Sequence, residues 1–97
     1  MALSTGSNKI KTAVFISGTG SNLNSLIKFS KLKESPITID IIISNNPKSE
    51  GLNFGKIYKI KKKIFNFKKN ASSEKKILIE LQKNKINLIC LAGFMKI

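Results

Sequence analysis

Residues 15–27 read FISGTGSNLNSLI, and this stretch decides the fold that we expect. An apolar run rich in Val, Ile and Phe is closed by Gly18 and Gly20, which predicts a buried strand over residues 11–17 followed by a tight turn. Beyond the turn, apolar residues recur at helical spacing, so a helix is expected over residues 21–33. A strand, a glycine turn and a helix in this order are typical of an α/β fold.

The rest of the chain continues this alternation of strands and helices. The further segments with such patterning are strands at 37–44, 62–67 and 86–94, a short and weakly helical stretch at 52–57, and a helix at 72–84. The Ile-rich strand 37–44 should be buried on both faces, and 86–94 is apolar enough to be central. Because βαβ crossovers are right-handed, we expect a Rossmann-like three-layer αβα fold whose parallel sheet has the strand order 3-2-1-4.

The composition indicates one small domain. The chain has 97 residues, 41% of them hydrophobic, and no apolar run approaches the length that spans a bilayer. Residues 1–9 read as a flexible N-terminal tail without the features of a signal peptide, so we expect a cytoplasmic protein. The formal net charge is +13, but all 18 basic residues are Lys. Together with the abundance of Ile and Asn, this favours a coding bias over nucleic-acid binding.

The residue types that are absent limit the chemistry. The sequence has no His, which excludes a His general base, a Ser-His or Cys-His nucleophile pair and a His-ligated metal within this chain. The single Cys90 lies in the apolar run LICLAG, so we expect a buried and unreactive thiol rather than a nucleophile.

The glycine turn itself allows two interpretations. In the first interpretation the turn binds a phosphate. The start of a helix offers free N–H groups, and glycine lets a ligand come close to the main chain. The side chains of Ser21 and Asn22 would add hydrogen-bond donors. A tight turn with a Ser cap fits the spacing equally well. A dinucleotide is disfavoured because Leu23 replaces the third glycine of its fingerprint and Asp40 falls inside the second strand. No Gly-Lys-Ser/Thr is present, so a phosphate monoester fits better than NAD or ATP.

Three segments together resemble one enzyme family. FISGTGSNL, IIISNNPKSEGL and LICLAGFMKI occur in the order found in phosphoribosylglycinamide formyltransferases, and the resemblance covers residues 10–97. It implies formyl transfer from 10-formyltetrahydrofolate, as cosubstrate and without a metal, to glycinamide ribonucleotide in purine synthesis. Another folate-dependent formyltransferase or a deformylase is the alternative within the fold. Deformylases carry an additional domain ahead of it, and methionyl-tRNA formyltransferases have a different first turn.

The resemblance also implies roles for particular residues. Gly20, Ser21 and Asn22 correspond to the turn that binds the ribonucleotide phosphate. The folate contacts the main chain of the segment that maps to Met95, Lys96 and Ile97. A basic residue ahead of the third helix contacts the folate in the family, and Asn70 stands at that position here, flanked by lysines.

The family's catalytic Asn, His and Asp all follow the LAGFM motif, and the sequence printed here ends before any counterpart. We therefore expect the N-terminal half of a formyltransferase domain over residues 10–97, truncated after the fourth strand. It should carry two ligand-binding segments, one at the end of the first strand and one at the end of the fourth. No catalytic residue is assigned, and the chain alone should be inactive.

A basic binding module is the competing functional class. Residues 56–69, KIYKIKKKIFNFKK, interleave Lys with aromatic residues as single-strand nucleic-acid binders can. The alternative is that Phe65 and Phe67 pack into the core while the lysines are solvated. We favour this packing, because aromatic side chains at a spacing of two are usually buried. Small-molecule substrates, and neither nucleic acid nor a membrane, are the expected partners.

Overall fold

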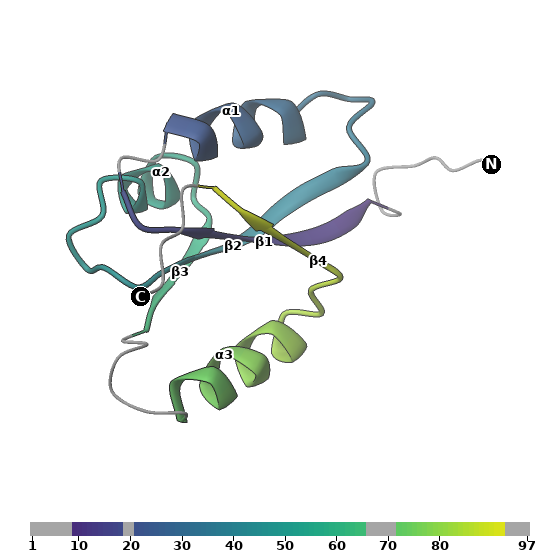
Figure 1. The fold of residues 1–97 in the computed structure, drawn as a ribbon. Coiled ribbons are helices and arrows are strands. Elements are labelled where there is room, and N and C mark those ends of the chain that lie inside the picture. Colours follow the sequence, from purple (N-terminus) through teal and green to yellow (C-terminus); the bar gives the residue numbers. More distant parts are fainter. Residues whose placement is uncertain (1–8, 19–20, 66–71, 93–97) are drawn as a thin grey trace.

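The structure is a computed structural model that describes residues 9–18, 21–65 and 72–92. Strands and helices alternate along the described residues (Figure 1). The elements are β1 (Ile10–Ile16), α1 (Ser21–Ser30), β2 (Ile37–Ser44), α2 (Leu52–Ile57), β3 (Lys61–Ile64), α3 (Ser72–Lys83) and β4 (Leu88–Leu91).

The strands form one parallel sheet in the order β3-β2-β1-β4, which confirms the predicted topology. β1 pairs with β2 from Ile10 opposite Ile37 to Ile16 opposite Ser44, with a register shift between Thr12 and Ala13. On its other side β1 pairs with β4. Because all four strands are parallel, their carboxyl ends lie at one edge of the sheet.

Helices cover both faces of the sheet, α1 and α2 on one and α3 on the other (Figure 1). Ile42 packs toward α1 and α2, whereas Ile41 and Ile43 pack toward α3, and all three are fully buried. The predicted burial of this strand on both faces is thus confirmed. The cluster on the α1 face contains Val14, Ile16, Leu23, Ile27, Ile42, Leu52 and Ala92. The cluster on the α3 face contains Ala13, Phe15, Ile41, Ile43, Ile77 and Leu81.

Several helices and strands are shorter than predicted. α1 ends at Ser30 rather than at 33, because the amide of Leu32 bonds to Phe29 O, three residues back, instead of continuing the α-helical pattern. β3 ends at Ile64, where its pairing with β2 ends. β4 begins at Leu88 rather than at 86, because Ile86 N is bonded to Leu81 O at the end of α3.

Within the described residues, the apolar fourth strand lies at the end of the sheet, the place that the predicted order 3-2-1-4 gives it, although its composition would suit a central strand. β4 pairs with β1 at the end of the sheet order, and Leu88, Ile89 and Leu91 are exposed. Cys90 is for the same reason only partly buried, packed against the cluster on the α1 face, so the expected full burial was wrong. Apolar character predicts that a strand can be covered on both faces but does not say what covers it.

Candidate functional site

The turn after β1 lies between the ends of two neighbouring strands. Ile16 is paired with Ser44 at the end of β2, and Ala92 N, just after β4, donates a hydrogen bond of 2.9 Å to Phe15 O. α1 begins at Ser21, so its N-terminus starts at the carboxyl edge of the sheet (Figure 1). In doubly wound sheets ligands bind at this edge, where helix N-termini place partial positive charge.

The loop between β2 and α2 fixes the beginning of the turn. Ser49 Oγ donates a 2.6 Å hydrogen bond to Gly18 O, which also accepts one of 3.1 Å from Gly51 N. Ser17 Oγ donates to Asn45 Oδ1 at 2.8 Å, and Asn46 Nδ2 donates to Ser17 O at 3.4 Å. One loop, about 30 residues further along the chain, thus holds the main chain of the turn from one side.

Sequence reasoning did not assign a role to this supporting loop. Its residues belong to IIISNNPKSEGL, which carried the family resemblance but suggested no contact with the glycine turn. Ser49 is buried, and Ser44 Oγ bonds both N and O of Asn46, which shapes the loop itself. A run of Ser and Asn between a strand and a helix was the available signal, because such side chains bond nearby main-chain groups.

The space beside Gly18 is open. A Cβ added there would meet no heavy atom of the described residues within 4 Å, and Gly18 is exposed. Neither packing nor an unusual φ therefore requires glycine at this position. An unobstructed main chain at the carboxyl edge fits the approach of a ligand from outside.

The predicted site residues are only partly within the described structure. Ser21 and Asn22 are the first two residues of α1, and Asn22 is exposed at the carboxyl edge. α1 has no acidic residue in its first turn, so no carboxylate of that turn opposes an anion. Gly20, Asn70, Met95, Lys96 and Ile97 lie outside the described residues.

Asp40 is held away from this edge. It lies inside β2, and its Oδ2 is 3.7 Å from Lys11 Nζ on β1. A ribose-binding acid would stand at the carboxyl end of this strand, which carries Ser44 and Asn45 instead. The position of Asp40 therefore agrees with the sequence argument against a dinucleotide.

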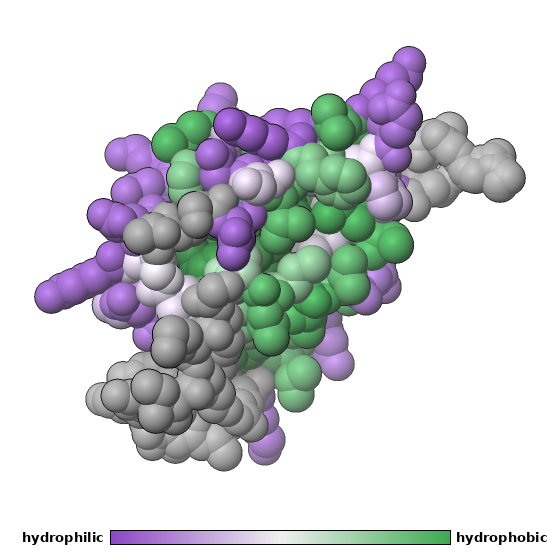
Figure 2. All heavy atoms as spheres, turned by 45° about the horizontal axis from the view of Figure 1, so that its top comes forward, coloured by the Kyte–Doolittle hydropathy of each residue, from purple (hydrophilic) through white to green (hydrophobic). Residues whose placement is uncertain are grey.

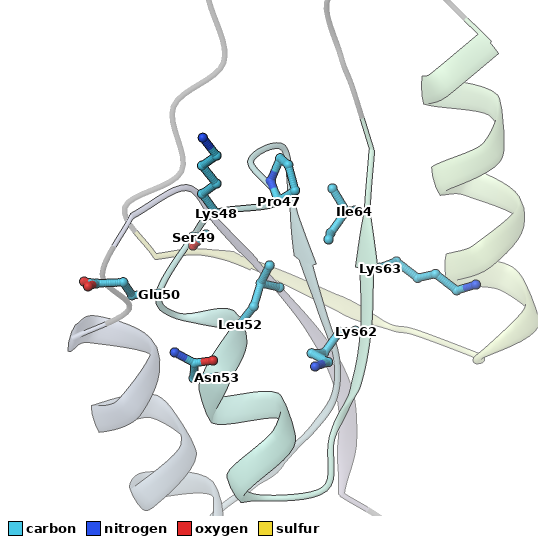
Figure 3. Close-up of a pocket in the computed structure, with 9 residues that line it drawn as sticks. All are labelled: Pro47, Lys48, Ser49, Glu50, Leu52, Asn53, Lys62, Lys63 and Ile64. Carbon is cyan, nitrogen blue, oxygen red and sulfur yellow. The ribbon is translucent and has the colours of Figure 1, made fainter.

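A groove of about 500 Å³ lies on the outer side of the supporting loop, between that loop and β3 (Figure 3). Its lining includes Lys48, Lys62 and Lys63. Figure 3 shows Lys62 and Lys63 on opposite sides of β3, while Lys48 extends away from both. The ammonium groups do not converge on a common point, so the groove does not form a defined anion site.

In the described part of the Lys-rich segment 56–69, residues 56–65, the aromatic side chains do not form one stacking surface. Tyr58 packs against the cluster on the α1 face, and its Oη donates a 3.1 Å hydrogen bond to Asn24 Oδ1. Phe65 packs against the cluster on the α3 face, as predicted, while Lys61–Lys63 are exposed. Phe67 lies outside the described residues. Aromatic rings on opposite faces of a sheet cannot stack successive bases of one strand.

The part of the chain that the structure describes contains neither a metal-binding cluster nor a membrane-spanning helix. No group of three or more His, Cys, Asp or Glu side chains there could hold a metal ion. None of the helices described is both long and apolar enough to cross a membrane.

Known proteins resemble this chain in sequence and in fold. The human trifunctional purine biosynthetic protein adenosine-3 is 38% identical over 92 residues, which are 92% of this chain and 9% of that protein. Phosphoribosylglycinamide formyltransferase of Haemophilus influenzae is 38% identical over 90 residues, covering 90% of this chain and 42% of that enzyme. The crystal structure of phosphoribosylglycinamide formyltransferase from Anaplasma phagocytophilum superposes with a TM-score of 0.82 at 36% identity, covering 91% of this chain and 41% of that chain.

This chain therefore spans less than half the length of each of these relatives. The family model for formyl transferases matches residues 10–97, which is nearly all of the sequence. The alternating fold, the 3-2-1-4 sheet and this match lead to one conclusion: the chain belongs to the formyl transferase family.

Proposed function

We propose that this chain supplies the ribonucleotide-binding part of a phosphoribosylglycinamide formyltransferase. The substrates would be glycinamide ribonucleotide and 10-formyltetrahydrofolate, with the latter as cosubstrate and no metal involved, in the cytoplasm. The observation that carries the proposal is the placement of the α1 N-terminus at the carboxyl edge of the sheet, beside an open and firmly held turn. The Haemophilus and Anaplasma relatives, which are phosphoribosylglycinamide formyltransferases by name, support the reaction class.

The phosphate would be held by local groups. The first N–H groups of α1 have no partner within the helix, and the helix dipole adds partial positive charge there. Gly20 would let the phosphate reach the main chain, while Ser21 and Asn22 would donate side-chain hydrogen bonds. The bonds from the β2–α2 loop to Ser17 and Gly18 would keep the turn in place before the ligand arrives.

The folate would bind on the β4 side of the same edge. The hydrogen bond from Ala92 N to Phe15 O brings the end of β4 beside the end of β1. The segment that begins just beyond, with Met95, Lys96 and Ile97, would offer main-chain groups to the pterin. Asn70, with Lys68 and Lys69, is the weaker candidate for a second folate contact because it is not itself basic.

Binding and orientation, rather than proton transfer, are the roles that we assign to this chain. Attack of the substrate amine on the formyl carbon creates an oxyanion and requires a proton to leave the nitrogen. The sequence has no His, and the family resemblance places the catalytic groups beyond the LAGFM motif. The chain alone should therefore transfer no formyl group.

Nuclear magnetic resonance titration of the ¹⁵N-labelled chain with ribose 5-phosphate tests the phosphate site. Charge-assisted hydrogen bonds contribute roughly 1.5–3 kcal/mol each, and ordering removes much of their sum, so we expect a Kd on the order of 1 mM. Amide shifts should concentrate at residues 17–23. Gly20→Val should abolish them by blocking the approach to the main chain, whereas Lys63→Ala, which removes one exposed charge, should not.

The opposite pattern would contradict the proposal. Shifts confined to residues 56–69, with the turn unaffected, would mean that the lysines attract the anion nonspecifically. The same result with an oligonucleotide, together with a steep salt dependence, would favour the basic module instead.

A further inference from the structure

The edge of the sheet at β3 is open among the described strands. β3 pairs with β2 alone, and all four of its residues are exposed. A strand that pairs on one side presents main-chain N–H and C=O groups on the other, where an extended peptide can add as a further strand. Three of the four residues are lysines, which protect the edge from a second copy of this chain because like charges would face one another. The edge is therefore suited to an acidic partner.

The side chains of β3 alternate between the two faces of the sheet. Lys61 and Lys63 lie on the α3 face, like the β2 residues with which they pair. Lys62 and Ile64 lie on the α1 face by the same register. A Cβ added at Gly55 of α2 would be 2.5 Å from Lys62 Cγ, so the stem of Lys62 lies against that helix. The two faces of this edge thus offer different surfaces to a partner.

On the α1 face, the groove between the supporting loop and β3 combines apolar and charged side chains. Its lining includes the apolar residues Pro47, Leu52 and Ile64 and the charged residues Lys48, Glu50, Lys62 and Lys63. Ile64 is 47% exposed, and Glu50 points away from β3 (Figure 3). Figure 2 shows hydrophilic side chains along the side of the molecule on which α2 and the loop before it lie in Figure 1. Diverging ammonium groups do not suit one compact anion, but they suit carboxylates spaced along an extended chain.

On the α3 face, Lys63 is the cation that a partner's carboxylate would meet. Lys61 Nζ already donates a 2.8 Å hydrogen bond to Asn84 Oδ1. Glu80 lines the space beside Lys63, and its Oε2 accepts a 3.1 Å hydrogen bond from Asn84 Nδ2. Within the described residues Lys63 forms no ion pair. The positive charge on this face is therefore not neutralised by the chain's own described carboxylates.

We propose that the β3 edge and the adjoining groove bind an extended segment of a partner protein in which acidic and apolar residues alternate. Successive side chains of a strand point to opposite faces. A segment added beside β3 would place its carboxylates near Lys63 on the α3 face and its apolar side chains over Ile64 and the groove. Opposite charges on neighbouring strands stabilise their pairing. A nucleic acid has neither a main chain that pairs with a strand nor apolar side chains for the groove, so a peptide fits better.

This surface is distinct from the phosphate site. The groove lies on the outer side of the supporting loop, whereas the glycine turn lies on its other side, where Ser49 Oγ is bonded to Gly18 O. The docking proposal therefore does not depend on formyl transfer, and its failure would leave the proposed function untouched.

Fluorescence anisotropy with two labelled peptides and the full 97-residue chain tests the inference. One peptide is Glu-Val-Glu-Ile-Glu-Val-Glu. The other is Glu-Glu-Glu-Glu-Val-Ile-Val, which has the same composition and charge without the alternation. At low ionic strength the alternating peptide should bind roughly tenfold or more tightly than its isomer. Amide shifts of the ¹⁵N-labelled chain should lie at residues 47–53 and 61–65.

Variants of one lysine separate the docking surface from general attraction to a basic chain. Lys63→Glu should weaken binding of the alternating peptide about fivefold or more, because like charges would then face one another. Lys63→Arg keeps the charge and should bind as the unaltered chain does. The matched control is Lys33→Glu, which makes the same change of charge in the exposed loop between α1 and β2, at the opposite end of the sheet. It should change the affinity far less, and ¹H–¹⁵N spectra check that every variant is folded.

Four results would overturn the inference. The first is no binding of the alternating peptide up to about 1 mM. The second is equal affinity for the two peptides, which would mean nonspecific attraction of negative charge. The third is equal weakening by Lys63→Glu and Lys33→Glu. The fourth is tighter binding of a single-stranded oligonucleotide of the same charge with shifts at the same residues, which would assign the surface to nucleic acid instead.

Discussion

At the scale of single residues, Ser49 shows how the fold prepares the turn. Its side chain is buried, and its Oγ donates a 2.6 Å bond to Gly18 O, 31 positions earlier in the chain. Among the described residues, none crowds the position of a Cβ at Gly18, so these residues hold its main chain on one side and leave the other side open. A turn that is fixed before binding loses less entropy when a ligand arrives.

Ser49→Ala should therefore affect both stability and binding. Loss of one buried hydrogen bond, with Gly51 N still bonded to Gly18 O, should lower the free energy of unfolding by about 1 kcal/mol. The affinity for ribose 5-phosphate should fall several-fold because the turn is less restrained. Ser30→Ala is the control, since Ser30 Oγ donates a similar bond to Ile27 O at the far end of α1. Urea denaturation and the titration measure the two effects, and equal affinity in both variants would argue against the supporting role.

At the scale of elements, the helix ends show local strain that was not apparent in the sequence. α3 ends in a Schellman motif, with Ile86 N bonded to Leu81 O, Lys85 N bonded to Gln82 O, and Lys85 at a φ of 57°. Ile86 packs beside Leu81 in the cluster on the α3 face. α2 ends with a similar bond, from Ile60 N to Gly55 O, and with Lys59 at a φ of 59°. Glycine usually occupies such positions because a side chain is strained there.

Lys85→Gly should stabilise the chain. Glycine removes the strain of the left-handed backbone conformation at position 85. The free energy gained in this way should exceed the free energy lost because glycine adds conformational entropy to the unfolded chain. The free energy of unfolding should therefore rise by about 0.5–1 kcal/mol. Lys83→Gly, within the last turn of the same helix, should lower it by about 1 kcal/mol. Urea denaturation of both variants gives the comparison. A loss of stability in Lys85→Gly would mean that the lysine contributes more than its backbone conformation costs.

Elements and topology were predictable from the sequence to different degrees. The continuous apolar runs around Ile16 and Ile42 identified two buried strands, because a strand that is buried on both faces carries apolar side chains on both. The limits of β3 and β4 were not predictable, because pairing partners and the cap at Ile86 decide where a short strand begins and ends. The contact between Ser49 and Gly18 was also missed, since a side-chain bond across 31 positions leaves no periodic signal.

At the scale of the whole molecule, the described fold has an asymmetric sheet. Lysines protect β3, whereas β4 exposes Leu88, Ile89 and Leu91. The formal net charge is +13, so separate copies of the chain should repel one another at low ionic strength. Salt screens this repulsion, and self-association should therefore increase with ionic strength.

The central claim is that the turn after β1 binds the phosphate of glycinamide ribonucleotide during formyl transfer. Its most direct test is steady-state kinetics of a chimera in which residues 10–97 replace the matched stretch of the Haemophilus influenzae enzyme. The account predicts formyl transfer by the chimera. Gly20→Val should raise KM for glycinamide ribonucleotide about tenfold or more and leave KM for 10-formyltetrahydrofolate nearly unchanged, while Lys63→Ala alters neither. A folded chimera without transfer, or an unchanged ribonucleotide KM in Gly20→Val, would contradict the claim.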